Sequence, residues 1–172
     1  TLRVWDPLTG ELVSTIDARD KRVDTAAYSP DGTQIVSSSG HDSLNVWDAV
    51  SGQDVLTLKG PIQRVISSLY SPDGTRIIGG IWRGPIRIWD ASTGQELPAL
   101  PTHTDSVTSM VYSPDGAQIC YSDSQGMVTV VDAKTGQQRL RFVGHAGEVT
   151  HVAISPDGSR IVSGGYDATV RV

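Results

Sequence analysis

A Trp-Asp dipeptide recurs along this chain at an interval of 42 residues. It is present three times intact and once with valine in place of tryptophan, at Trp5-Asp6, Trp47-Asp48, Trp89-Asp90 and Val131-Asp132. Self-similarity with a period of about 20 to 50 residues is the signature of a repeat architecture, in which each unit folds as one small motif and packs on its neighbours. The period divides the chain into four units of equal length: 5–46, 47–88, 89–130 and 131–172.

Two turn sequences repeat in phase with the dipeptide. Each unit has an Asp followed four residues later by a Gly, as in Asp6 and Gly10, and each contains Ser-Pro-Asp-Gly, first at 29–32. In that tetrapeptide the Pro presets a tight turn, the Asp bonds back to the backbone, and the Gly takes a positive φ. Between the turns lie short apolar or alternating runs of strand length, and no stretch has a sustained helical period. In the first unit these runs are 11–16, 23–28, 34–38 and 43–47. The sequence predicts an all-β fold with one antiparallel four-stranded sheet per unit.

These features resemble the WD-repeat (Trp-Asp repeat) β-propeller family over the whole chain. The last unit follows the family pattern most fully, with Gly144-His145, the turn at 155–158 and Tyr166-Asp167. The resemblance implies four-stranded blades around a central channel, each blade packed on its neighbours. In the family the strands of a blade run a, b, c and d from the channel outward, and the Trp-Asp pair ends strand c.

On this template the chain is a single propeller region that begins and ends inside a blade. Residues 1–22 supply strands c and d of one blade, 23–58, 65–100 and 107–142 are complete blades, and 149–172 supply strands a to c of another. We expect the chain to be part of a larger ring of about seven blades. Two alternatives stay open. One chain could close a four-bladed ring by itself, or two chains could associate through their open blade edges.

Composition restricts the classes of function. The formal net charge is −5, so the chain offers no basic field for nucleic acid, and no apolar run approaches the roughly 20 residues of a membrane span. Cys120 is the only cysteine and takes a position that is Val or Ile in the other units, which predicts a small core residue. The lack of a disulfide framework suits a cytoplasmic location.

Motifs of catalysis and of ligand binding are missing from the sequence. There is no phosphate-binding glycine loop, no nucleophile elbow and no Cys/His cluster at zinc spacing. The recurrent turn aspartates, such as Asp31 and Asp157, are assigned a local backbone role rather than a metal site. We therefore predict no catalytic residue, no cofactor and no metal.

The resemblance also implies a structural hydrogen-bond network in each blade. Its members are a His before strand a, a Ser or Thr on strand b, an Asp in the b–c turn and the Trp of strand c. The residues assigned to it are His145, Ser163 and Asp167 together in the last unit, His103 in the third, and Trp47 and Trp89 at the ends of two c strands. Because most units lack part of this network, we expect stability to come mainly from apolar packing between blades.

The d–a loops and b–c turns form the edge of the propeller on which the family commonly binds partners, and loops on a rigid scaffold are where recognition residues collect. Tryptophan, tyrosine and arginine are enriched at binding hot spots. We predict a protein or peptide contact centred on Trp82 and Arg83, with Arg19, Arg64 and Tyr166 as secondary members. The alternative is that Trp82 only folds over the blade edge and the arginines are solvated.

The predicted function is that of a non-catalytic interaction scaffold or sensor, of the kind appended to signalling proteins. The alternative from another class is a propeller enzyme, or a small-ligand-binding propeller, with its site at the central channel. Such a site needs converging carboxylates or histidines, yet strand a opens with valine in every unit: Val23, Val65, Val107 and Val149. His151 is the titratable residue expected nearest the channel, and we assign it a structural role.

Overall fold

The computed structural model describes residues 1–18, 22–38, 43–58, 64–100 and 106–172. All regular secondary structure in these ranges is β-strand, in seventeen strands that form five antiparallel sheets. The predicted all-β class is therefore confirmed. Nothing in the described ranges is a helix of the length and hydropathy that a membrane span requires.

Three sheets have four strands each, and an incomplete sheet stands at either end of the chain. The complete sheets are β3 (Ala26–Tyr28), β4 (Gln34–Ser38), β5 (Leu44–Asp48) and β6 (Asp54–Leu58); β7 (Val65–Tyr70), β8 (Arg76–Ile81), β9 (Ile86–Asp90) and β10 (Glu96–Leu97); and β11 (Val107–Tyr112), β12 (Gln118–Asp123), β13 (Met127–Asp132) and β14 (Gln138–Val143). The incomplete ones are β1 (Leu2–Trp5) with β2 (Leu12–Ile16), and β15 (Val149–Ile154) with β16 (Ile161–Gly165) and β17 (Val170–Arg171).

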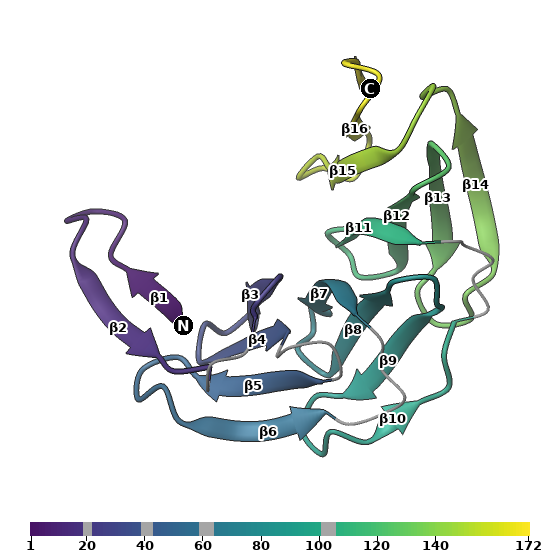
Figure 1. The fold of residues 1–172 in the computed structure, drawn as a ribbon. Coiled ribbons are helices and arrows are strands. Elements are labelled where there is room, and N and C mark those ends of the chain that lie inside the picture. Colours follow the sequence, from purple (N-terminus) through teal and green to yellow (C-terminus); the bar gives the residue numbers. More distant parts are fainter. Residues whose placement is uncertain (19–21, 39–42, 59–63, 101–105) are drawn as a thin grey trace.

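The five sheets follow one another around an arc (Figure 1). Strands β3, β7, β11 and β15 lie on its inner side, while β6, β10 and β14 lie on its outer side (Figure 1). Within each complete sheet, strands that follow one another along the chain are hydrogen-bonded neighbours. The described residues thus form a partial propeller, in which each complete sheet is one blade with strand a inside and strand d outside.

The Ser-Pro-Asp-Gly turns connect strands a and b and also interlock neighbouring blades. Their four glycines have φ values of 71° to 73°, which side chains other than glycine rarely adopt. A Cβ atom placed on Gly116 would lie 3.5 Å from Cδ of Pro72, in the turn of the preceding blade. Gly74 and Gly158 stand in the same relation to the prolines of the turns before them. The period of the sequence is therefore also the spacing of a stack of turns.

The hydrophobic core lies between the blades. One cluster joins Val46 and Leu58 of the β3–β6 blade to Ile77 and Trp89 of the next blade, and similar clusters fill the other interfaces. Burying one large apolar side chain contributes about 1.5–3 kcal/mol. Each blade is consequently held in place mainly by the apolar side chains of its neighbours.

Two strands differ from the sequence pattern. Strand β3 begins at Ala26 instead of Val23, because the hydroxyl of Ser38 accepts the amides of Asp24 (2.7 Å) and Thr25 (3.2 Å) before the regular ladder starts. Strand β10 has only two residues. It stops at Leu97 because the next residue, Pro98, has no amide hydrogen to donate to the ladder.

Candidate functional site

The b–c turns and the residues just before strand a meet at one edge of the blades. The second residue of each described turn donates its amide to a carbonyl of that segment: Trp82 to Arg64 (2.8 Å), Ser124 to Ser106 (3.1 Å) and Tyr166 to Glu148 (2.9 Å). The two residues of each pair are separated by the same number of positions, so the contact is a property of the repeat. We call this edge, formed by turns 81–85, 123–127 and 165–169 with Arg64, Ser106 and Glu148, the rim.

The turn of the β7–β10 blade has an unusual backbone. Arg83 has a φ of 52°, whereas the left-handed residue comes one position later in the other two turns, at Gly126 (86°) and Ala168 (59°). In this turn the residue after Gly84 is Pro85, and a residue that precedes proline favours extended conformations. For a side chain as large as arginine this conformation costs about 1–2 kcal/mol. Strain of this kind concentrates at functional sites.

The preceding side chain, Trp82, has two guanidinium groups close to its ring. The Cζ atoms of Arg64 and Arg83 are each 5.8 Å from the centroid of its ring. Cations at this distance from an indole face are attracted by the ring quadrupole, with about 0.5–1 kcal/mol per pair at an exposed site. The Trp82 side chain is 38 % exposed, so the ring is both held in place and accessible.

A carboxylate from the neighbouring blade lies beside one of these arginines. Asp24, which precedes β3, accepts a hydrogen bond from Nε of Arg22 (2.6 Å) and lies 3.6 Å from Nε of Arg64. Arg64 thus lies within ion-pair distance of Asp24 and over the ring of Trp82. We call Arg22, Asp24, Arg64, Trp82 and Arg83 the rim cluster. It has three positive charges and one negative charge.

The rim cluster is also tied to the next blade along the arc. The hydroxyl of Ser106, just before β11, accepts the amide of Arg83 at 3.2 Å. Sequence reasoning missed both Asp24 and Ser106. A signal for Asp24 was available, because the same position in the other units is the uncharged Ile66, Thr108 or Thr150.

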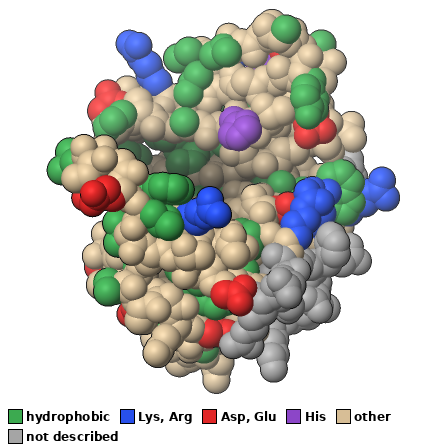
Figure 2. Space-filling model, turned by 60° about the vertical axis from the view of Figure 1, so that its left-hand side comes forward, with side chains coloured by type: hydrophobic (Ala, Val, Ile, Leu, Met, Phe, Trp, Pro, Cys, Tyr) green, Lys and Arg blue, Asp and Glu red, His purple; other side chains and the backbone are tan. Residues whose placement is uncertain are grey.

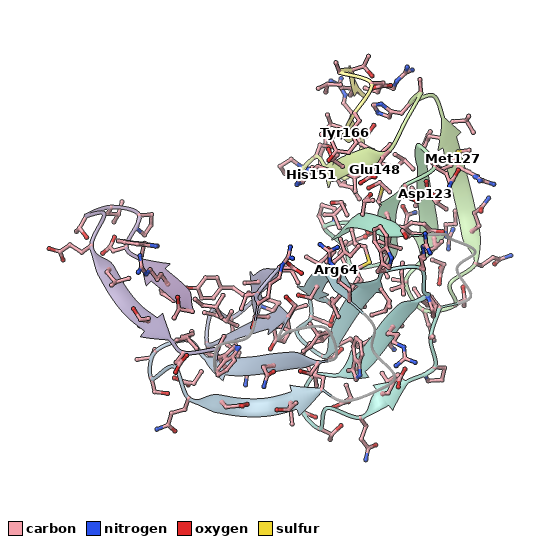
Figure 3. The ribbon with its side chains drawn as sticks, in the orientation of Figure 1. Arg64, Asp123, Met127, Glu148, His151 and Tyr166 are labelled. Atoms are coloured by element: carbon pink, nitrogen blue, oxygen red, sulfur yellow. The ribbon has the colours of Figure 1, made fainter. Side chains whose placement is uncertain are left out.

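The remaining predicted contact residues lie elsewhere. Tyr166 is exposed, but it belongs to the β15–β17 sheet beside Glu148 and His151, while Arg64 lies near β7, with the β11–β14 blade between the two (Figure 3). Arg19 is outside the described residues. The structure therefore brings together Trp82, Arg83 and Arg64 and places Tyr166 apart from them on the same rim.

The hydrogen-bond network is present in the β15–β17 sheet. Nδ1 of His145 lies 3.0 Å from both carboxylate oxygens of Asp167, and its Nε2 lies 2.9 Å from the hydroxyl of Ser163. The imidazole is almost fully buried, with 2 % of its side chain exposed. Hydrogen bonds from His145 and then Thr169 hold the pKa of Asp167 well below its usual range. Because the carboxylate is ionised and can only accept, Nδ1 donates the hydrogen bond to Asp167, while Nε2 is hydrogen-bonded to the hydroxyl of Ser163.

The other members of this network differ from blade to blade. In the β3–β6 blade Nε1 of Trp47 donates to the hydroxyl of Ser37 at 2.9 Å. In the next blade Gly79 replaces that serine, and the buried Nε1 of Trp89 has no hydrogen-bond partner among the described residues. The position of His103 falls outside the described residues. Trp89 is accordingly held by packing alone.

Three of the valines that open strand a were expected to face the channel, but they are buried between blades. Val65, Val107 and Val149 do not line the channel, because an irregularity in the a–b pairing just after each one turns it into the core between blades. His151 follows Val149 and is exposed on β15. Figure 2 shows this side of the molecule as a hollow with hydrophobic side chains around it. No constellation of acidic or basic side chains among the described residues supports a channel site.

The turn aspartates and Cys120 have local structural roles. Asp31 accepts the hydroxyl of Ser29 (2.6 Å) and the amide of Thr33 (3.0 Å), as its counterparts do in the other turns, and these bonds lower its pKa. Within the described ranges no group of three or more His, Cys, Asp or Glu side chains is arranged to hold a metal ion. Cys120 is buried among valines, and burial raises the pKa of its thiol to about 12.

The fold defines a class of protein, the repeat β-propellers. Solved structures support this class: the crystal structure of the computationally designed Ika4 protein matches with a TM-score of 0.79 at 25% sequence identity, over 95% of this chain and 97% of that chain. A comparison with curated protein sequences gave no match.

The family follows from the sequence comparison. The family model described as WD domain, G-beta repeat (WD40) matches residues 10–48, 94–132 and 136–172, which together are more than half of the chain. The chain therefore belongs to the WD40 repeat family, whose members are generally scaffolds for protein interactions. The matched segments leave out 49–93, the stretch that contains Gly79, Trp82 and Arg83.

Proposed function

We propose that this chain is a non-catalytic interaction scaffold that holds a protein or peptide partner on its rim, centred on Trp82 and Arg83 with Arg64 beside them. The observation that carries the proposal is the exposed indole of Trp82 with two guanidinium groups close to its ring, on a turn that takes a strained backbone at Arg83. Aromatic and arginine side chains held in this way are the typical anchors of protein interfaces.

The charge of the rim cluster indicates the chemistry of the partner. Three guanidinium groups face one carboxylate there, while the chain as a whole has a net charge of −5. Guanidinium groups form their strongest contacts with carboxylates and phosphates. The partner segment is therefore acidic, with an apolar or aromatic side chain that packs on Trp82.

Tyr166 supplies a second contact farther along the rim, and Arg19 stays a predicted member. A partner that reaches both Trp82 and Tyr166 spans the turn of the β11–β14 blade between them. A cytoplasmic setting and a role in signalling are proposals of the same kind. They are supported by the composition and by the family to which the chain belongs.

Selection from a displayed library of random peptides tests the proposal directly. Peptides enriched on the unchanged chain are expected to be acidic, and their affinity is expected to fall by about tenfold or more in Trp82→Ala and Arg83→Asn. Asn tolerates the left-handed backbone at position 83, so this variant removes the guanidinium without disturbing the turn.

Arg139→Ala is the matched control. Arg139 is an exposed arginine on strand β14 that pairs with Asp132, away from the rim. Its removal is expected to leave peptide affinity unchanged. The proposal is wrong if the enriched peptides are neutral or basic, or if they bind the Trp82 and Arg83 variants as tightly as the unchanged chain.

A further inference from the structure

A pocket lies between two complete blades, at the edge opposite the rim. It has a volume of about 450 Å³. Its walls come from the a–b turns of the β7–β10 and β11–β14 blades and from the c–d turn of the second blade, at 132–135. Because both blades have all four strands, the pocket is flanked by complete sheets on both sides. We call it the interblade pocket.

The guanidinium group in this pocket has no partner within the described part of the chain. Three arginines there are partly buried, namely Arg64, Arg76 and Arg87. Arg64 lies 3.6 Å and Arg87 lies 3.1 Å from a carboxylate oxygen. Arg76, the first residue of β8, lines the pocket and forms neither an ion pair nor a side-chain hydrogen bond with another described residue. Since a partly buried charge needs a partner, this guanidinium is available to an anion from outside the chain.

Tyr112, the last residue of β11, supplies a hydroxyl to the same pocket. Burial raises the pKa of Tyr112 to about 12, and the nearby charge of Arg76 acts in the opposite direction. The phenol is therefore neutral at ordinary pH and able to donate a hydrogen bond. Its hydroxyl forms no hydrogen bond with another of the described residues.

The equivalent position one repeat earlier has a neutral pair instead. There Tyr70 donates its hydroxyl to Oε1 of Gln34 at 3.1 Å. The residue that corresponds to Gln34 is Arg76, and a guanidinium has no acceptor atom. The exchange of glutamine for arginine thus removes the acceptor from this pair and leaves two donors side by side.

Lys134 brings a second positive charge to the pocket. It is an exposed residue of the c–d turn, and the equivalent residue of the preceding blade is Ser92. Its ammonium group forms no ion pair with a described residue. The pocket therefore combines a guanidinium, an ammonium and a phenol, and all three donate hydrogen bonds. Three donors without acceptors fit an oxyanion.

Three carboxylates on the walls restrict the charge of that oxyanion. Asp73 and Asp115 accept hydrogen bonds from the serine hydroxyls of their own turns, at 2.5 and 2.6 Å, and Asp132 pairs with Arg139 at 2.6 Å. These contacts lower the pKa of all three groups, with a small further contribution from Arg76 at Asp73. Because the carboxylates stay ionised, they repel an extended polyanion. One phosphate group is small enough to contact the donors alone.

We propose that the interblade pocket binds the phosphate group of a small phosphate monoester through Arg76, Lys134 and Tyr112. Guanidinium and ammonium groups are common partners of phosphate, and a phosphate offers more acceptor oxygens than a carboxylate to donors that come from two blades. The volume of the pocket falls within the range of about 300–1,000 Å³ that is typical of small-molecule sites. The pocket and the rim are at opposite edges of the blades, so this inference does not depend on the proposed function.

Amide NMR spectra of the full 172-residue chain test the site. We expect inorganic phosphate and phenyl phosphate to cause saturable shifts at the amides of 71–76, 112–117 and 132–135, with dissociation constants on the order of 1 mM. Acetate at the same ionic strength is expected to bind at least about threefold more weakly. Equal binding of acetate would show a general anion site and overturn the assignment to phosphate.

Two substitutions give the pocket the composition of its neighbours. Arg76→Gln introduces the residue found at positions 34 and 118, and Lys134→Ser introduces the residue found at position 92, so the repeat already accommodates both. We expect Arg76→Gln to weaken the binding of phenyl phosphate by about tenfold, because it removes a charged hydrogen-bond donor. Lys134→Ser, at an exposed position, is expected to weaken it by about threefold.

Arg160→Gln is the matched control. It makes the same exchange at the equivalent position of the last unit, where Ile154 stands in place of the tyrosine. Its affinity for phenyl phosphate is expected to equal that of the unchanged chain. Shifts that do not saturate, that spread over all blades, or that persist with unchanged affinity in Arg76→Gln would each contradict the proposed site.

Discussion

The turn of the β7–β10 blade and the turn of the β15–β17 sheet occupy the same place in the repeat and use it in opposite ways. In the sheet, Asp167 turns inward and joins His145 and Ser163 in a buried network. In the blade, Trp82 and Arg83 turn outward at the equivalent positions. A position released from the structural network is available for recognition, provided that packing holds the blade.

Packing does hold the β7–β10 blade. Trp89 is fully buried although its Nε1 has no hydrogen-bond partner among the described residues, and Ile77, Ile78 and Ile86 are fully buried around it or on the opposite face. An unpaired buried donor costs about 1–3 kcal/mol. The apolar side chains of this blade offset that cost.

Removal of the imidazole from the network is the largest effect that we expect. His145→Ala should lower the free energy of unfolding by about 2 kcal/mol, because it deletes the buried bonds to Asp167 and Ser163. For a chain of this size that corresponds to a fall in Tm of about 4–8 °C. Arg83→Asn in the outward turn should change stability by less than about 0.5 kcal/mol. Calorimetry of both variants measures the two losses of stability. Equal losses in His145→Ala and Arg83→Asn would contradict the proposed difference between the two turns.

A smaller effect is expected from the strand-b position that supports each tryptophan. Ser37→Ala should cost about 1–2 kcal/mol, because it leaves the buried Nε1 of Trp47 unsatisfied. The reverse change, Gly79→Ser, should recover less than this for Trp89. A Cβ at position 79 would lie 3.0 Å from Cζ3 of the Trp89 ring, so the ring must shift to accept the new hydroxyl. Urea unfolding of the two variants measures both values. A full recovery in Gly79→Ser would show that packing is looser than the structure implies.

The smallest effect concerns pH. The pKa of Asp167 is lowered mainly by its bond to His145, and the pKa of Asp157 is lowered to about 2 by Ser155. A carboxyl group with a lower pKa in the folded state stabilises fully above its unfolded pKa of about 4, and this contribution is lost as the pH falls through the folded value. Stability should therefore decline from about pH 4 downward.

The Asp167→Asn variant isolates one part of that decline. We expect its unfolding free energy to depend less on pH below about 4 than that of the unchanged chain, as measured by urea unfolding at several pH values. Arg83→Asn, which alters the outward turn at the equivalent position, should keep the full dependence. Identical pH profiles for the two variants would mean that Asp167 is not coupled to folding as its contacts indicate.

Much of the fold could be predicted from the sequence because its signals are local. The Ser-Pro-Asp-Gly turns and the alternating runs lie within a few residues of one another, and they placed β4 at its observed bounds. Two departures also had local causes that were easy to miss, namely Pro98 at the end of β10 and the hydroxyl of Ser38 beside β3.

The candidate site was only partly predictable. Trp82 and Arg83 stand out because their neighbours in the repeat are different residue types, and Arg64 follows from the spacing of the loops. Asp24 and Ser106 contact the same cluster from the two adjacent blades. No local sequence pattern predicts that these residues come together. The valines that open strand a were misjudged for a related reason, since the pairing irregularity that buries them is a property of the folded ladder.

The 42-residue period was sufficient to establish the blade, its strand order and the family, because these depend on short-range turns and on apolar periodicity that each unit carries in itself. The rim cluster depends on which side chains of neighbouring blades meet across an interface. The contacts of Arg83 with Ser106 and of Arg64 with Asp24 join residues more than 20 positions apart, so they exist only once the blades are packed together. Packing between blades thus turns four similar units into a surface with distinct parts.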